Sequence, residues 1–317
     1  MWKYVCKRCG KSIVALMLCS FVCFILIRQL PGSIAYSIYG ANAQRLTEQE
    51  IERIENALVS EQSIFQQYVD WASNLLRGNW GFSFSQQQEV YPMLAQQSMF
   101  TFMIVALSLV LSNFITIISF VFLQRTKLKT VRFVIEKTYL LFMIVPGFWI
   151  CFFLLWLLGV EFQIFPLYGL GNDSFLSTLY HIALPSLALV LPSVFYGIKL
   201  LENDWASIQQ LPFLKHLSQR RISTFRYAKH VLPHFCLVLL QLNGYLVVGF
   251  LGGVIAVETV FSIPGIGQLT VEATKMHDYP TLLMIILCSL AVVLIVQLII
   301  DLLSSWLDPR VYRSLKE

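Results

Sequence analysis

Six long apolar segments constrain this chain more than any other feature of its sequence. Each is long enough for a helix to cross the ~30 Å hydrocarbon core of a bilayer, which takes about 20 residues. The composition agrees, because 57% of the 317 residues are hydrophobic and only 13% are charged, whereas a soluble domain is about one quarter charged. The sequence therefore predicts an all-α integral membrane protein with six transmembrane helices. The expected spans are Ser12 to about Leu30, Phe100–Leu123, Tyr139–Val160, Leu176–Leu201, Val231–Val260 and Leu282–Leu303.

The first apolar segment has a second interpretation. Four basic residues precede it, and the small-x-small sequence Ser33-Ile34-Ala35 follows it, a pattern that is also typical of a cleaved signal peptide. The segment is at the long end for a signal sequence, and the charge distribution is consistent at every loop with six helices. We therefore expect it to remain as the first transmembrane helix.

Basic residues indicate on which side of the membrane each loop lies. With six helices both termini lie on one side, and 18 of the 23 lysines and arginines fall on that side. Cytoplasmic loops carry an excess of Lys and Arg, so we expect both termini and the loop between the fourth and fifth helices in the cytoplasm. The net charge of +5 thus reflects membrane topology rather than nucleic-acid binding. The five basic residues on the other side are Arg28, Arg45, Arg53, Arg77 and Lys275.

The predicted segments follow one another in a simple order. Residues 1–30 form the cytoplasmic N-terminus and first helix, and 31–98 an external helical cap. Residues 99–304 form the transmembrane core with helices two to six, and 305–317 the cytoplasmic C-terminus. Within the core, a cytoplasmic loop at 202–229 joins the fourth helix to the fifth.

The external cap is expected to contain two helices. Thr47-x-x-Glu50 is a capping box that predicts the start of the first one. A second helix should carry four apolar or aromatic residues on one face and end before Gly78. That face consists of Phe65, Tyr68, Val69 and Leu75.

Proline residues fall inside two of the predicted spans. Pro146 precedes Gly147 in the third span, and Pro185 and Pro192 lie in the fourth. Proline removes a backbone hydrogen bond, but membrane helices tolerate it because neighbouring helices satisfy the freed groups. We therefore expect kinked spans at both places.

The polar stretch 202–229 mixes basic and large apolar residues. A loop surrounded only by solvent has little use for so many large apolar side chains, whereas a short amphipathic helix on a membrane surface or a partner protein does. The stretch is therefore predicted to be the site at which another protein binds this membrane channel and moves it. Its large apolar residues include Trp205, Phe213, Leu214, Leu217 and Phe225, and its basic residues include Lys215, Arg220, Arg221, Arg226 and Lys229.

Motifs of catalysis are missing from the sequence. Gly10-Lys11-Ser12 resembles the end of a phosphate-binding loop, but Val5 stands where the first glycine would be. The five histidines and the single C-x-x-C pair do not complete a metal site. We therefore expect no catalytic residue, cofactor or metal ion, and a chain that is not an enzyme by itself.

Charged residues inside the spans are few, which disfavours an ion-coupled carrier. A pore or transporter whose driving energy comes from outside this chain fits better. Glu258, near the end of the fifth span, is a candidate functional residue because a charge there is costly. The alternative, which we favour, is a carboxylate that caps or packs a helix near the membrane interface.

The segment VETVFSIPGIGQL at Val257–Leu269 is the most specific motif of the chain, and Asp278-Tyr279-Pro280 follows it. These motifs resemble those of the permeases of bacterial ABC importers for dipeptides, oligopeptides and nickel. Similar segments run through nearly the whole chain in order. They are Gln66–Tyr68, Gly78–Ser83, Val145–Trp149, Phe165-Pro166, Ala183–Leu189, Asp301–Leu303 and Leu307–Arg310.

The resemblance implies a six-helix permease subunit in the bacterial inner membrane. It would pair with a second homologous permease, two cytoplasmic ATPase subunits would drive it, and an external solute-binding protein would deliver its cargo. Membrane lipid would surround it, and no nucleic acid would be a partner.

In that family the cytoplasmic loop before the fifth helix bears an ATPase-coupling motif with small alanines and a glycine. Here Leu217 stands at the alanine and Arg221 at the glycine, or Arg220 if the alignment slips by one. Arginine disfavours the backbone conformation that glycine permits, so the detail of the turn is expected to differ. The residues expected to contact the ATPase are Phe213, Leu214, Lys215, Leu217, Arg220 and Arg221.

Short peptides are the expected cargo, and nickel or a metal chelate is the nearest alternative. Export of antimicrobial peptides is a further variant. The altered coupling loop also leaves open a membrane scaffold or sensor that has lost transport, and a self-sufficient secondary carrier is the reading that the few intramembrane charges disfavour.

Overall fold

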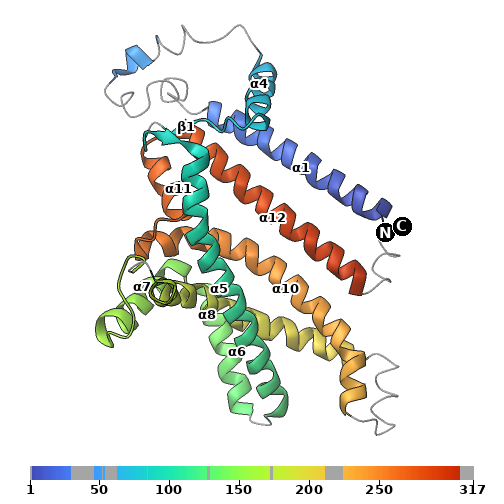
Figure 1. Cartoon of the computed structure of the whole chain (residues 1–317). Coiled ribbons are helices and arrows are strands. Elements are labelled where there is room, and N and C mark those ends of the chain that lie inside the picture. Colours follow the sequence, from blue (N-terminus) through green and yellow to red (C-terminus); the bar gives the residue numbers. More distant parts are fainter. Residues whose placement is uncertain are drawn as a thin grey trace. The chain divides into compact units, whose positions relative to one another are not determined.

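The computed structural model describes residues 2–29, 46–51, 53, 63–83, 85–126, 129–171, 174–210 and 224–307. In that part of the chain nearly every element is a helix (Figure 1), so the predicted all-α class is confirmed. The elements in order are α1 (Trp2–Arg28), α4 (Ile64–Leu76), β1 (Phe82–Ser83), β2 (Gln88–Glu89), α5 (Val90–Arg125), α6 (Lys129–Ile144), α7 (Gly147–Leu154), the π-helix η2 (Leu155–Glu161), α8 (Phe175–Gln209), α10 (Thr224–Phe261), α11 (Ile266–Lys275) and α12 (Tyr279–Leu307).

The chain divides into two compact units, which we describe separately. The first comprises Met1–Phe102 with Ser262–Ile295, and the second comprises Met103–Phe261 with Val296–Glu317. The long helix α5 contributes its first part to one unit and its second part to the other.

Five of the six predicted spans are continuous helices that are long and apolar enough to cross a membrane. They are Cys6–Ile27, Val90–Arg125, Phe175–Gln209, Val231–Phe261 and Tyr279–Leu307.

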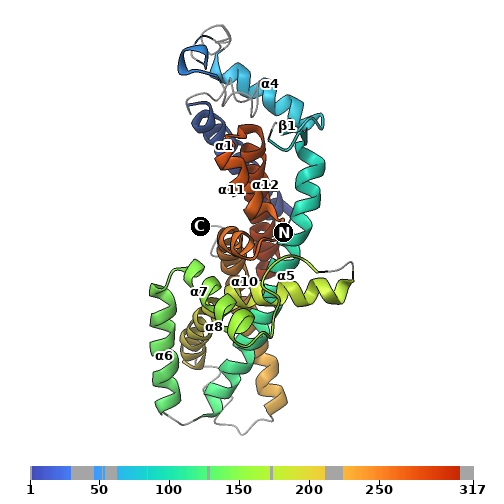
Figure 2. The same cartoon turned by 90° about the vertical axis from the view of Figure 1, so that its left-hand side faces the viewer.

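The third span, expected at Tyr139–Val160 with a kink at Pro146, is bent so sharply there that it forms two helical segments. Thr130–Phe142 and Gly147–Glu161 are separate helical segments that meet at 109°, and Figure 2 shows the sharp bend between α6 and α7. Pro146 explains the break, because it has no backbone N–H to continue α6 and disfavours helical geometry at the residue before it. It instead becomes the N-cap of α7. The chain has six spans when this bent pair is counted as one.

The prolines of the fourth span behave differently. Pro185 and Pro192 both lie inside α8, which continues from Phe175 to Gln209. Both are packed in the second unit, with Pro185 buried and Pro192 half-buried. The helix therefore tolerates its prolines within a packed bundle, as membrane helices do.

The first unit packs α1, α4, α11, α12 and the start of α5 around one apolar cluster. Aromatic residues join α1 to α4: the rings of Phe24 and Tyr68 are 5.7 Å apart, those of Phe24 and Trp71 5.6 Å. The hydroxyls of Ser20 and Tyr68 are hydrogen-bonded at 2.7 Å. This contact ties the cap helix to the first span.

Both predicted cap features are found where the structure describes them. The Thr47 backbone N–H donates to Glu50 Oε2 at 2.8 Å, and the Glu50 N–H donates to Thr47 Oγ1 at 3.4 Å, which confirms the capping box. The backbone hydrogen bond from Thr47 lowers the pKa of the Glu50 carboxyl. The predicted second helix is α4, but its expected apolar face is only half covered, since Tyr68 and Leu75 pack on the core and Phe65 stays 64% exposed.

The second unit holds α5 against α8 and α10 through small and polar side chains. Ser112 and Ser193 share a hydrogen bond at 2.6 Å between α5 and α8. The amides of Asn113 and Asn243 exchange hydrogen bonds at 2.7 and 3.1 Å between α5 and α10. In a membrane the hydrophobic effect does not drive helices together, and close packing with interhelical hydrogen bonds does.

Candidate functional site

A cavity of about 640 Å³ lies among α6, α7, α8 and α10 of the second unit. Its lining is mainly apolar and aromatic, with polar groups contributed by Tyr139, Ser193, Tyr196 and Tyr245. The described residues that line it include no charged side chain. Cavities of roughly 300–1,000 Å³ accommodate small molecules. A neutral lining of this size offers a polar solute room without a strong electrostatic trap.

Glycines of α10 make this space. An added Cβ at Gly249 or Gly252 would have no heavy atom within 4 Å, so both positions open onto free volume. Gly253, which also lines the cavity, differs because a Cβ there would come within 2.8 Å of Leu189 Cδ2 on α8. The glycines at 249–253 thus allow the close contact between α10 and α8 at Gly253 and leave the cavity open at Gly249 and Gly252.

Aromatic pairs form part of the cavity wall. The rings of Tyr196 on α8 and Tyr245 on α10 are stacked 4.3 Å apart. Phe142 on α6 stacks on Phe195 of α8 at 5.0 Å. Stacking of this kind fixes ring positions beyond what burial alone does. Tyr245 is nevertheless 57% exposed, so the cavity is open on that side of the chain.

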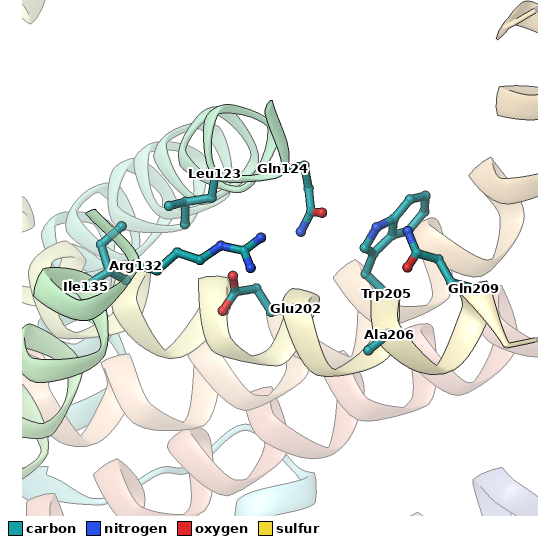
Figure 3. A pocket seen from close by; sticks show the side chains of 8 residues that line it. All are labelled: Leu123, Gln124, Arg132, Ile135, Glu202, Trp205, Ala206 and Gln209. Carbon is teal, nitrogen blue, oxygen red and sulfur yellow. The ribbon is translucent and has the colours of Figure 1, made fainter. Parts of the chain in front are cut away.

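A second cavity of about 310 Å³ lies where α8 leads into the stretch 202–229 (Figure 3). It is polar, in contrast to the first. Figure 3 shows the guanidinium of Arg132 and the carboxylate of Glu202 pointing toward one another. Residues of three helices line this pocket: Leu123 and Gln124 of α5, Arg132 and Ile135 of α6, and Glu202, Trp205, Ala206 and Gln209 of α8.

The predicted ATPase-contact residues cannot be placed. Phe213, Leu214, Lys215, Leu217, Arg220 and Arg221 all lie outside the described residues, between the end of α8 and the start of α10. Of this stretch the structure describes 202–210 and 224–229, and nearly all of these residues are helical. The coupling role of these six residues stays a prediction.

Glu258 lies in α10, three residues before its end, and is fully buried. A carboxylate in this environment is costly unless its surroundings satisfy it. Burial places it inside the packed unit. Whether it packs the helix, as we favour, or serves transport stays a prediction.

A polar cluster in the first unit joins segments far apart in sequence. Asp278, buried just before α12, accepts hydrogen bonds from Ser83 Oγ at 2.5 Å and from Ser85 Oγ at 2.7 Å. The Gln86 side chain also donates to Glu272 of α11 at 3.3 Å. The hairpin of β1 and β2 is therefore fastened to the α11–α12 connection.

The described part of the chain contains no group of three or more His, Cys, Asp or Glu side chains that could hold a metal ion. Sequence reasoning missed both cavities and the Asp278 cluster. The glycine run of α10 and the Tyr residues of α8 and α10 were visible signals, but glycine in a membrane helix serves equally for contact and for space.

Comparison with known proteins covers nearly the whole chain. Residues 121–313 match the family described as binding-protein-dependent transport system inner membrane component, and residues 1–105 match the N-terminal family of such membrane components. A probable peptide ABC transporter permease of Sinorhizobium fredii is 26% identical over 98% of this chain and 99% of its own length. The dipeptide transport system permease DppB of Lactococcus lactis is also 26% identical, with the same coverage of both chains. The glutathione transport system permease GsiC of Shigella flexneri is 27% identical, again over 98% of this chain and 99% of its own.

Proposed function

The chain belongs to the family of binding-protein-dependent transport system inner membrane components, and from this premise we propose that it forms the translocation path of an ATP-driven importer for short peptides. It is a multi-pass inner-membrane permease subunit and not itself an enzyme. The observation that carries the peptide proposal is the match over 98% of the chain to permeases whose names specify peptides.

The cavity of about 640 Å³ is the proposed translocation path. It lies among membrane helices, its described lining is uncharged, and Gly249 and Gly252 keep it open. A path of this kind lets peptide groups pass without holding them tightly. Tyr245, 57% exposed at its edge, is where a second permease subunit would complete the wall.

The proposed assembly contains one second permease and two ATPase subunits, with a solute-binding protein on the outer side. A cytoplasmic location for both termini and the stretch 202–229 is supported by the excess of basic residues in these segments. The cap at 31–98 then lies outside, where the hairpin that Asp278 fastens would support a delivering protein.

Coupling is proposed to act through 202–229. Leu214 and Leu217 would pack into a groove of the ATPase, and the basic residues would meet acidic residues around it. Replacing both leucines by aspartate should therefore separate ATP hydrolysis from transport without unfolding the spans. Leu214→Asp/Leu217→Asp is expected to reduce uptake by about tenfold or more, because buried apolar anchors dominate such interfaces. Unchanged uptake by this double variant would contradict the coupling proposal.

The test of the function is uptake by the complete transporter in proteoliposomes with its solute-binding protein. A radiolabelled dipeptide should enter only when ATP is inside and the binding protein outside. Uptake of radioactive nickel instead would establish the metal alternative. A chain that co-purifies with an ATPase but supports uptake of neither cargo would be a scaffold or sensor, and gradient-driven uptake by the chain alone would make it a secondary carrier.

A further inference from the structure

The polar pocket of Figure 3 and the proposed translocation cavity are built on the same two helices. Helix α6 places Arg132 in the pocket and Tyr139 and Phe142 in the cavity wall. Helix α8 does the same with Glu202 and Tyr196. A displacement of this helix pair at the pocket would therefore reach the cavity.

Between the two cavities, α6 and α8 are packed together by apolar and aromatic side chains. Ile135 and Val131 of α6 lie against the buried cluster that includes Val194 and Ile198 of α8. Further along, Phe142 stacks on Phe195 with an angle of 17° between the rings. Close-packed interfaces deform little and transmit strain, so the two helices are suited to move as one.

Arg132 and Glu202 stand at the end of this packed interface. Arg132 directly follows Val131, and Glu202 lies one helical turn beyond Ile198. Their charged groups point toward one another (Figure 3), and Glu202 is half-buried whereas Arg132 is exposed. Opposite charges attract more strongly near a protein surface than in bulk water, because the effective dielectric constant is lower. Trp205, Gln209 and Gln124 surround them without adding a further charge to the lining.

We propose that Arg132 and Glu202 are a positioning pair that ties the end of α6 to α8 and passes movement of the stretch 202–229 to the cavity wall. Glu202 is the first residue of that stretch, so the pair connects the start of 202–229 to α6. Beyond Pro146 the α6 segment gives way to α7, at 109° to it, and α7 lines the cavity through Phe148, Ile150 and Cys151. The proposal rests on the proposed function, in which 202–229 receives movement from an ATPase.

A charge swap in the complete transporter tests the pair. Arg132→Glu and Glu202→Arg each place like charges face to face, and the double variant restores opposite charges. Each single variant should lower the dipeptide transported per ATP hydrolysed by about tenfold, and the swap should return it to within about twofold of the unmodified transporter, as coupled residues do in a double-mutant cycle. The yield of assembled transporter is measured in parallel, and if a single variant lowers the yield, the same rescue by the swap is expected there.

A matched control makes the same charge change on α6 outside the pocket. Lys137→Glu, at a residue whose ammonium lies 5.4 Å from the Phe133 ring centroid, should leave the ratio within about twofold. The proposal is overturned if the single variants behave like this control. It is overturned equally if the swap is as impaired as the single variants, which would assign Arg132 to another group such as a lipid phosphate. Absence of dipeptide uptake by the unmodified transporter would instead refute the proposed function.

Discussion

The glycines of α8 and α10 are of two kinds, and the difference separates the packed part of the second unit from its open part. A Cβ at Gly197 would come within 2.9 Å of Thr116 Cγ2 and 3.2 Å of Leu242 Cδ2, so this glycine brings helices into contact. A Cβ at Gly249 or Gly252 would meet nothing within 4 Å. At Gly197 the missing side chain allows close approach of the helices, and at Gly249 and Gly252 it leaves open space in the proposed translocation path. The same residue type thus brings helices together at one place and leaves a cavity at another.

Filling the open part should have the largest effect on transport. Gly252→Trp places a bulky ring in the cavity, and we expect uptake to fall by about tenfold or more because the path is occupied, while the helix contacts persist. Dipeptide uptake and the yield of assembled transporter measure this. Gly252→Ala serves as the control, since its added methyl group meets open space. Normal uptake by the tryptophan variant would show that the cavity is not part of the translocation path.

Filling the packed part should instead damage stability. Gly197→Leu forces atoms against Thr116, a buried and stiff β-branched residue, and overpacking of this kind costs about 1–3 kcal/mol. The free energy of unfolding in detergent should fall, and uptake should decline only with the amount of assembled protein. A stable Gly197→Leu chain with blocked uptake would mean that the two kinds of glycine are not separate.

Removing a hydrogen bond between packed helices should have the smallest effect. Asn113→Ala deletes the reciprocal amide pair with Asn243, and such bonds in membranes contribute on average about 0.6 kcal/mol. Asn243 would still donate to the carbonyl oxygen of Leu239, which limits the loss. Unfolding measurements on Asn113→Ala, Asn243→Ala and the double variant isolate the pair. Strict additivity of the two losses would show that the amides do not interact.

Sequence patterns predicted the helical class and five continuous spans because hydrocarbon thickness imposes a length that can be counted. They predicted the Thr47–Glu50 capping box because its partners are three residues apart. They predicted kinks at the prolines of both spans but not the size of each one, because Pro146 breaks its span and the chain turns by 109°, whereas α8 continues through Pro185 and Pro192. Local sequence does not specify the neighbours that decide between those outcomes.

Contacts between residues far apart in the chain could not be predicted from the sequence either. Asp278 belongs to a segment that resembles the permease family, yet its partner Ser83 precedes it by 195 residues. Likewise, nothing in the sequence tells Gly252 from Gly253, because the distinction lies in the position of Leu189 on another helix.

The central claim is that the cavity among α6, α7, α8 and α10 is the translocation path, and blocking it chemically tests this most directly. Gly252→Cys, in a chain whose seven native cysteines are replaced, is labelled with a bulky maleimide in the complete transporter. Phe152→Cys on α7, 52% exposed and outside the cavity lining, is the matched control. We predict that full labelling at position 252 abolishes dipeptide uptake and labelling at 152 does not. Undiminished uptake with position 252 fully labelled would contradict the account.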